Sequence, residues 1–449
     1  MAVVESAALE SAALEDGATP FWGRALERLV SRYGVVNTVQ RLPPLRGLPD
    51  YHAIAAMLGR DASGGCEGAE QTTATGRSLG EPALARALAL AEAAERYAAW
   101  EPADPAYTWA TPAELQGRGR VLRYADLPAC SAQEYAHPQC PVRPFDPDAR
   151  IRWVRGFDFL TGEPVWVPAC MASYRLPSPE PAERFWYPIS TGHAVHTDPA
   201  AAVFAAVAEV VERDAIALLW LRRLPLPRIP AAALGAQAAP LLAWCADHHV
   251  TASLFDATTD IGLPTAYCVL SSPFDPVLRT LVGCSSGLSI EQTAAKALLD
   301  VVSIRSTKST AVAAPERYED FHTVSDGARY MGTAAREHAF DFLLGERDDR
   351  PRFEDRGTYA PDLPRALRRL GRTFAEADME VILVDRGRAE LREAGLSAVC
   401  ALIPKLMPMS LRPLARFTAH PRLFSGPARM GYGAGDCGDD INPLPQPFA

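Results

Sequence analysis

The stretch STGHAVHTDPAAAVFAAVAEVVERDAIALLW, residues 190 to 220, joins a polar loop to a long Ala-rich segment. Asp198 is a favourable N-cap residue, because its side-chain oxygen can accept a hydrogen bond from an unpaired amide of the first turn. Pro199 suits the first helical position, since it has no backbone N–H to satisfy. We predict a loop followed by a helix that runs to about Arg222.

The same loop-then-helix unit occurs twice more in the chain. In ATGRSLGEPALARALALAEAAERY, residues 74 to 97, a helix is expected to begin at Pro82. In VGCSSGLSIEQ, residues 282 to 292, a helix is expected to begin after Ser289, and Gln292 three residues later completes a capping-box pattern. The recurrence predicts a composite fold in which several helices are arranged around a shared site.

Paired acids stand at the same place in the first two of these helices. Both contain the string E-x-x-E-R, at residues 92–96 and 209–213. Residues three apart lie on one helix face, so each pair projects two carboxylates together. Buried acids need compensation, and a divalent cation such as Mg²⁺ supplies it through oxygen ligands. The third helix keeps Asp300 and Arg305 but has Ser303 in place of a second acid. On the pattern alone, a solvated helix face remains an equal alternative.

Strands and helices alternate along the chain, which predicts an α/β fold. The three long helices are expected to end near residues 100, 222 and 306. We also expect a short helix at residues 50–58 and a polar, Gly-rich loop at residues 63–80. Apolar segments predict strands at residues 151–156, 165–169, 250–255, 265–270, 278–283, 380–384 and 399–402.

The composition is that of a globular protein with a large core. Of 449 residues, 48% are hydrophobic and 22% charged, and the formal net charge of −9 argues against a nucleic-acid or anionic-membrane partner. The nine cysteines form no C-x-x-C pair, so a local zinc motif is not expected. We expect instead that these thiols are reduced and mostly buried in a cytoplasmic protein. No secretory signal and no long apolar run are visible, so we expect no membrane span.

Several single residues are candidates for function. His193 and His196 flank the loop of the second unit and could act as bases or contact phosphate, but solvated side chains are the simpler expectation. Cys284 in the third loop is expected to be a buried bystander thiol. Trp220 and the segment Leu218–Leu221 are expected to lie in the core.

The chain ends in INPLPQPFA, residues 441 to 449. Alternating prolines fix φ, remove amide donors and favour an extended strand that loses little conformational entropy when it docks. On these residues alone, a solvated tail is the simpler expectation.

Three stretches resemble the signatures of the YcaO superfamily. ATGRSLGEPALARALALAEAAERY is similar to the first signature, a glycine-containing loop and an Ala-rich helix ending in ExxER. The stretch quoted at the opening is similar to the second, including its ERDA ending and the Trp that follows, and VGCSSGLSIEQTAAKALLDVVSIRS is similar to the third. PLPQP resembles the PxPxP tail of the azoline-forming branch, and this resemblance implies a tail docked near the active site. The resemblance covers residues 60 to 449 and implies a YcaO-like α/β fold of repeated strand-helix units, with the ATP-site helices packed around a shared centre.

The resemblance implies an ATP-dependent cyclodehydratase of azole-modified peptide biosynthesis, the class of pathway that makes thiazole/oxazole-modified microcins. In this family a Cys, Ser or Thr side chain of a ribosomal precursor peptide attacks the preceding amide carbonyl. Phosphorylation by ATP turns the amide oxygen into a leaving group, and a thiazoline or oxazoline remains. The enzyme's task is then mainly positioning and charge stabilisation.

The resemblance also assigns roles by position, with ATP and Mg²⁺ as cofactors. The acids expected to hold magnesium and the nucleotide phosphates are Glu92, Glu95, Glu209 and Glu212. The other expected nucleotide-binding residues are Arg77, Arg213, Asp300 and Arg305. The tail prolines Pro443, Pro445 and Pro447 are the expected catalytic-site residues. The sequence departs from the family at Leu88, Thr197 and Ser303, but both acid pairs are intact and predict a working ATP site.

Residues 1–60 are expected to form an N-terminal arm and a small accessory segment, and residues 61–449 the YcaO-like domain with its tail. Because so short a first segment leaves no room for a fused peptide-binding domain, we expect a separate leader-peptide-binding partner of the ubiquitin-activating type. The other expected partners are the precursor peptide, a flavin-dependent dehydrogenase where the ring is oxidised, and a second copy of the chain in a homodimer. We expect no nucleic-acid or membrane partner.

Two alternatives stay open at this point. The same site could support thioamidation or macroamidine formation with another nucleophile, although the proline tail argues against it. The altered third signature also allows a non-catalytic scaffold subunit of a peptide-modifying synthetase complex.

Overall fold

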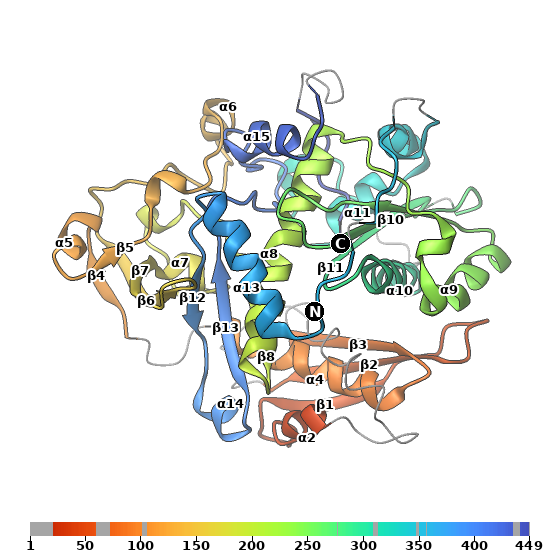
Figure 1. Ribbon diagram of the computed structural model, residues 1–449, viewed down its shortest axis with the longest axis horizontal. Helices are drawn as coiled ribbons and strands as arrows, with labels where there is room; N and C mark the ends of the chain where they lie inside the picture. Colours follow the sequence, from red (N-terminus) through yellow and green to blue (C-terminus); the bar gives the residue numbers. More distant parts are fainter. Residues whose placement is uncertain are drawn as a thin grey trace. The chain divides into compact units, whose positions relative to one another are not determined.

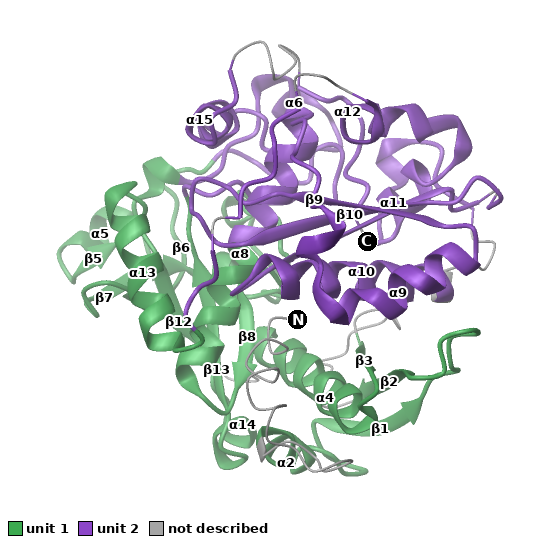
Figure 2. Cartoon of the chain, turned by 45° about the vertical axis from the view of Figure 1, so that its right-hand side comes forward, with its two compact units in different colours: residues 1–126, 145–210, 361–404 green, residues 127–144, 211–360, 405–449 purple. Residues whose placement is uncertain are grey.

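The computed structural model describes residues 21–59, 72–100, 106–275, 277–308, 313–346, 350–355, 357–433 and 441–448 (Figure 1). The chain forms two compact units, each built from three segments (Figure 2). Unit 1 contains residues 1–126, 145–210 and 361–404, and unit 2 contains residues 127–144, 211–360 and 405–449. The predicted α/β class is confirmed, and the predicted boundary after residue 60 stays a prediction.

The first sheet of unit 1 is antiparallel, in the order β1-β2-β3, with β1 at Val36–Arg41, β2 at Tyr51–Leu58 and β3 at Thr73–Leu79. Helix α4, Pro82–Ala99, packs on β2 and β3. The two elements approach so closely that a Cβ on Gly76 of β3 would lie 2.0 Å from a backbone oxygen of α4. This contact fixes the strand directly against the helix that carries the first acid pair.

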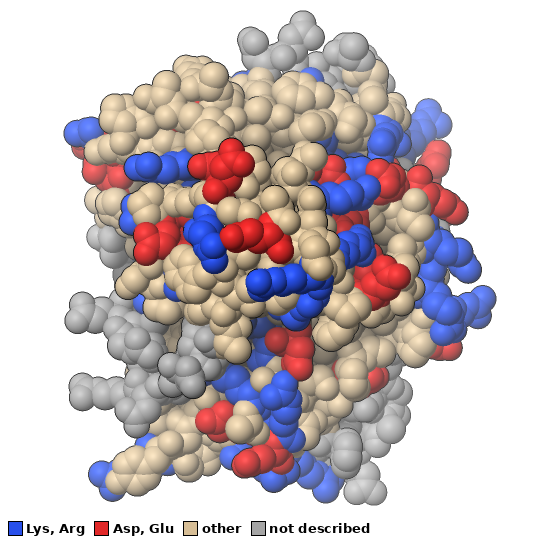
Figure 3. Space-filling view, turned by 90° about the vertical axis from the view of Figure 1, so that its left-hand side faces the viewer, with Lys and Arg blue, Asp and Glu red and all other residues tan. Residues whose placement is uncertain are grey.

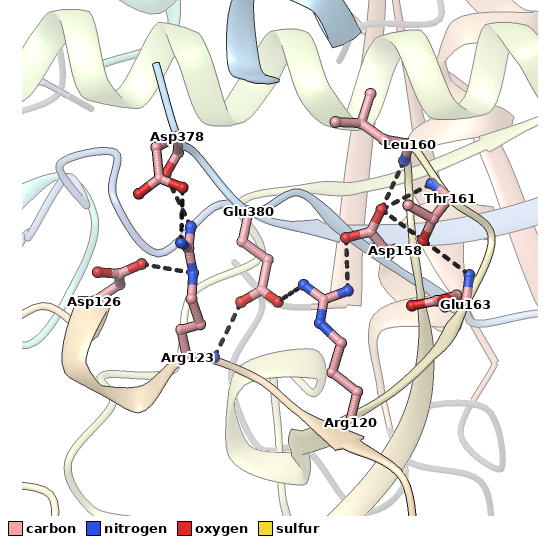
Figure 4. Close-up of polar contacts among 9 residues, drawn as sticks. All are labelled: Arg120, Arg123, Asp126, Asp158, Leu160, Thr161, Glu163, Asp378 and Glu380. Atoms are coloured by element: carbon pink, nitrogen blue, oxygen red, sulfur yellow. Dashed lines mark hydrogen bonds and ion pairs between the residues drawn. The ribbon is translucent and has the colours of Figure 1, made fainter. Parts of the chain in front are cut away.

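The second sheet of unit 1 has the order β5-β7-β6-β12-β13-β8, with β4 paired to β6. Its strands are β4 Thr108–Ala110, β5 Arg120–Val121, β6 Ile151–Asp158, β7 Pro164–Pro168, β8 His193–His196, β12 Ile382–Asp385 and β13 Ser397–Leu402. Arg120 of β5 lies between two acids (Figure 4). Its Nη1 donates to Oδ2 of Asp158 at 2.7 Å, and its Nη2 donates to the buried Glu380. The backbone N–H of Arg123 also donates to Glu380 at 3.0 Å, so this ion network joins segments far apart in the sequence.

Unit 2 contains an antiparallel sheet in the order β11-β10-β9, with β9 at Thr251–Asp256, β10 at Thr265–Ser271 and β11 at Thr280–Ser286. Helix α10, Ile290–Lys308, packs on β10 and β11 and against α9, Gly235–Asp247. Every residue of β11 is buried, including the polar Thr280, Ser285 and Ser286.

Helix α8, Pro199–Arg222, begins in unit 1 and ends in unit 2. The remaining α-helices are α2 Phe21–Glu27, α5 Pro112–Gln116, α6 Ala132–Ala136, α7 Ala169–Ala172, α11 Asp326–Met331, α12 Asp341–Leu344, α13 Leu363–Glu376, α14 Ala389–Glu393 and α15 Arg422–Arg429. Among the described residues, no helix combines the length and apolarity needed to cross a membrane.

The three long helices are confirmed, and so are the predicted strands, each to within a few residues. Asp198 caps α8 by accepting a hydrogen bond from the N–H of Ala200 at 2.8 Å. Two predictions are wrong. Residues 51–58 are strand β2 and not a helix, because their burial alternates with the period of a strand. The predicted loop at 63–80 contains strand β3, and its residues 60–71 lie outside the described residues.

Candidate active site

Glu92 of α4 is held by hydrogen bonds on both of its carboxylate oxygens. Oε2 accepts from the backbone N–H of Thr75 at 2.9 Å, and Oε1 accepts from Nη2 of Arg96 at 2.8 Å. Burial opposes the charge of Glu92, but the positive charge and hydrogen bond of Arg96 outweigh it and lower its pKa. Glu92 is therefore an ionised acid in a prepared position.

The pKa of Glu95, one turn along the same helix, is shifted in the opposite direction. Its side chain is only 7% exposed. Burial, together with the nearby carboxylates of Glu209 and Glu92, raises the pKa of Glu95 to about 7. Unit 1 thus gathers three acids from α4 and α8 in a place where added positive charge is favourable.

Glu209 accepts a hydrogen bond from the backbone N–H of Gly192 at 3.0 Å. Gly192 has φ +86°, and a Cβ there would lie 2.4 Å from the carbonyl oxygen of Ala401, so only glycine fits. The loop before β8 is therefore shaped to bring one amide donor to this carboxylate.

The two histidines beside this loop are buried, which corrects the expectation that they are solvated. His193 is 1% and His196 5% exposed. Burial lowers the pKa of His193 to about 4, and its Nδ1 lies 2.9 Å from the carbonyl oxygen of Ser190. Sequence reasoning missed their place because β8 was interpreted as part of a loop.

In unit 2, Glu212 of α8 is 5% exposed and accepts from the backbone N–H of Ser286 at 3.0 Å. Arg213 donates to its other oxygen. The guanidinium carbon of Arg213 lies 5.2 Å from the ring centroid of Phe448, a cation–π distance. The second half of the E-x-x-E-R string is therefore fixed by the end of β11 and by the tail.

The tail is bound along the C-terminal part of α8. Asn442 donates from its N–H to the carbonyl oxygen of Leu221 at 2.8 Å, and Trp220 Nε1 donates to the carbonyl oxygen of Leu444 at 3.1 Å. A Cβ on Gly327 would lie 2.1 Å from the carbonyl oxygen of Gln446. Of the three predicted tail residues, Pro443 is exposed, whereas Pro445 and Pro447 are buried. The prediction of a docked tail agrees with these contacts.

The third signature is only partly arranged for binding. Asp300 is half-buried on α10, but Arg305 donates from Nη2 to Asp275 at 2.7 Å and from Nη1 to the carbonyl oxygen of Leu278 at 2.8 Å. Ser303 is fully buried, and its Oγ donates to the backbone. Arg305 therefore stabilises the loop before β11 in this structure.

Two details of the third helix differ from expectation or were missed. Ser289 Oγ accepts from the N–H of Gln292 at 3.2 Å, as a cap should, but Gln292 Oε1 is buried without a hydrogen-bond partner, so the capping box is incomplete. Cys284 is buried as expected, and its pKa is raised by burial and by Glu212, while the charges of Arg213 and Lys296 oppose the rise. Lys296 is a basic candidate that the motif comparison did not single out.

Arg77 lies on β3, two residues from the Thr75 amide that binds Glu92, and alternation puts both residues on the same face of the strand. Among the described residues, no three His, Cys, Asp or Glu side chains lie close enough together to form a ready-made metal cage. Glu92, Glu209 and Glu212 instead accept hydrogen bonds from backbone amides, and Glu92 and Glu212 also form ion pairs with arginines.

The model of one protein family, described as YcaO cyclodehydratase, ATP- and Mg²⁺-binding, matches residues 78–407. The chain belongs to the YcaO family. Among curated proteins, none has a matching sequence. The family assignment confirms the predicted family, the enzyme class and, at the level of the family, the cofactors ATP and Mg²⁺.

Solved structures show the same fold. A heterocyclase in complex with substrate and cofactor is 20% identical with a TM-score of 0.74, over 95% of this YcaO chain and 57% of its own. YcaO from Methanopyrus kandleri, bound with AMPPCP and Mg²⁺, is 17% identical with a TM-score of 0.60, over 87% and 93%. The E. coli microcin synthetase McbBCD complex is 13% identical with a TM-score of 0.60, over 92% and 96%. This chain thus spans little more than half the length of the first of these proteins.

Proposed function

We propose that this YcaO protein is the ATP-dependent cyclodehydratase subunit that converts Cys, Ser or Thr of a ribosomal precursor peptide to thiazoline or oxazoline. The observation that carries the proposal is the buried acid pair on α4, with Glu209 beside it and Glu212 three residues further along α8. All four acids lie within the residues matched by the family model.

A divalent cation beside the acids of unit 1 would be electrostatically favourable, and binding it would require these side chains to move closer together than they lie in this structure. Glu95 is buried beside two carboxylates and has a pKa raised to about 7, so a bound cation would relieve both the burial cost and the repulsion. We assign magnesium to Glu92, Glu95, Glu209 and Glu212. The amides of Thr75, Gly192 and Ser286 already orient three of these carboxylates, which limits the ordering that binding must cost.

We assign the nucleotide to Arg77, Arg213 and Asp300, with Lys296 as an added basic group. Bound ATP supplies the phosphoryl group that makes the amide oxygen a leaving group. Arg213, held between Glu212 and Phe448, is oriented to stabilise negative charge. Arg305, also predicted to bind nucleotide, would first have to leave its ion pair with Asp275.

Precursor peptide and partner proteins belong to the same proposal. One similar structure is the microcin synthetase complex with pro-MccB17 bound, and another is a heterocyclase with its substrate. This likeness supports a precursor peptide and partner proteins in general. We further propose a separate leader-binding partner of the ubiquitin-activating type, a homodimer, a cytoplasmic location and, where an azole is the product, a flavin-dependent dehydrogenase.

The test is incubation with ATP, Mg²⁺, a candidate precursor peptide and the partner protein. Each ring should remove about 18 Da from the peptide and release one phosphate. Glu209→Ala/Glu212→Ala should abolish both signals. A mass gain from exchange of oxygen for sulfur would instead indicate thioamidation.

One observation favours a second function, a non-catalytic scaffold. The third signature has the buried Ser303 where the first two helices have their second acid. If the assembled complex with Glu209→Ala/Glu212→Ala forms product at the normal rate, the scaffold function is correct and the cyclodehydratase proposal fails.

A further inference from the structure

Helix α13, Leu363–Glu376, carries a row of arginines on its solvent face. One side of the helix is apolar and buried, which fixes its orientation on unit 1, and the opposite side is exposed. The exposed basic residues, spaced as neighbours on one helix face, are Arg365, Arg368, Arg369 and Arg372.

Within the part of the chain that the structure describes, the side chains of Arg365, Arg368 and Arg372 make no hydrogen bond or ion pair. Glu376 stands four residues after Arg372 without forming an ion pair with it, and Asp362 is used as the N-cap of the helix. On the middle of the face drawn in Figure 3, by comparison, basic and acidic side chains lie interspersed. These three arginines therefore have no acidic partner among the described residues.

This arrangement is unfavourable for the helix itself. Like charges four residues apart repel, which applies to Arg365 with Arg369 and to Arg368 with Arg372. A cation in the first turn, the place of Arg365, also opposes the helix dipole. An anionic partner lying along the row would relieve both effects.

An exposed apolar side chain adjoins the row. Leu160 is 49% exposed. Leu160 lies against the middle of α13, because a Cβ on Gly371 would be 2.8 Å from its Cδ2. Arginine is enriched at protein interfaces, and an exposed apolar side chain beside it adds surface that a partner could bury.

We propose that the arginine row of α13, together with Leu160, is a docking surface for an acidic polypeptide segment. The inference rests on the proposed function, in which the substrate is a peptide delivered by another protein. A lipid surface fits less well, because the apolar side of α13 is buried and cannot insert. A nucleic acid fits less well with a chain of net charge −9.

The test is fluorescence anisotropy of a short labelled polyglutamate peptide titrated with the full chain, without ATP. The wild type should bind, and its affinity should fall as salt is raised. Arg365→Glu/Arg368→Glu/Arg372→Glu should weaken binding at least about tenfold, whereas replacement of the same three residues by Lys should retain most of it. The matched control, Arg28→Glu/Arg32→Glu, changes two exposed arginines of the same unit and should bind like the wild type.

Equal binding by the triple Glu variant, or a loss in the control as large as in the triple variant, would overturn the proposal. So would binding of phosphatidylserine vesicles that is lost in the triple variant while polyglutamate binding is not. Because the titration contains no ATP, a failure of ring formation with intact peptide binding would count against the proposed function alone.

Discussion

Asp214 of α8 is the residue whose removal should cost unit 2 the most stability. It is fully buried and accepts hydrogen bonds from Arg422 Nη2 at 2.6 Å and from the N–H of Met407 at 2.8 Å. Arg422 is 3% exposed and also donates to Asp260 at 2.6 Å. Burial opposes the charge of Arg422, but the two carboxylates outweigh it and raise its pKa.

Asp214→Ala leaves this guanidinium with one carboxylate and leaves the N–H of Met407 without its acceptor. Removing one partner of a buried ion pair costs about 3 to 5 kcal/mol, because the remaining charge stays buried. For a unit of roughly 200 residues this corresponds to a fall in Tm of about 6 to 20 °C.

The assay is urea unfolding at pH 7, followed by circular dichroism and tryptophan fluorescence. The control is Arg392→Ala, which removes one partner of the exposed Asp385–Arg392 pair and should cost at most about 0.5 kcal/mol. Asp214→Ala/Arg422→Leu should be more stable than Asp214→Ala, because the orphaned charge is gone. The reasoning is refuted if Asp214→Ala matches the control or if the two substitutions simply add.

Three further predictions concern the site. Protonated Glu95 stabilises the folded, metal-free protein at low pH, and this contribution is about 3 kcal/mol for a pKa moved from 4.5 to about 7. The contribution should be lost as pH rises through 7, which urea unfolding at several pH values should show. Glu95→Gln should abolish this pH dependence. Gly192→Ala should weaken Mg²⁺–ATP binding several-fold in calorimetry, through about 1 to 3 kcal/mol of strain and a displaced amide, whereas Gly162→Ala, also at positive φ but with open space, should not. Deletion of residues 443–449, which removes the Phe448 ring and an acceptor for the core tryptophan, should cut ring formation at least about tenfold with an unchanged circular dichroism spectrum.

The fold was predictable from the sequence where local signals agree. Asp198 and Pro199 mark the start of α8 by capping chemistry alone, and the same is true of Pro82 in α4. Strand β2, Tyr51–Leu58, was missed because three alanines among larger residues give its sequence no clear period, and tertiary pairing decides such segments.

The candidate site was predictable as a set of acids but not as a geometry. The spacing of each E-x-x-E-R string suffices to place its acids on one helix face. The amides that orient them, from Thr75, Gly192 and Ser286, carry no side-chain signature. The ion pair of Asp214 with Arg422 joins residues too far apart in sequence for any local pattern to indicate it.

The central claim is that the acid pairs of α4 and α8 bind Mg²⁺ and ATP, and isothermal calorimetry with AMPPCP tests it most directly. The wild type should bind the nucleotide only with Mg²⁺ present, and Glu209→Gln/Glu212→Gln should weaken binding at least about tenfold. The matched control is Glu390→Gln/Glu393→Gln, an E-x-x-E pair exposed on α14, which should bind like the wild type. The claim would be contradicted if the Glu209→Gln/Glu212→Gln variant bound the nucleotide as tightly as the control variant, or if binding did not depend on Mg²⁺.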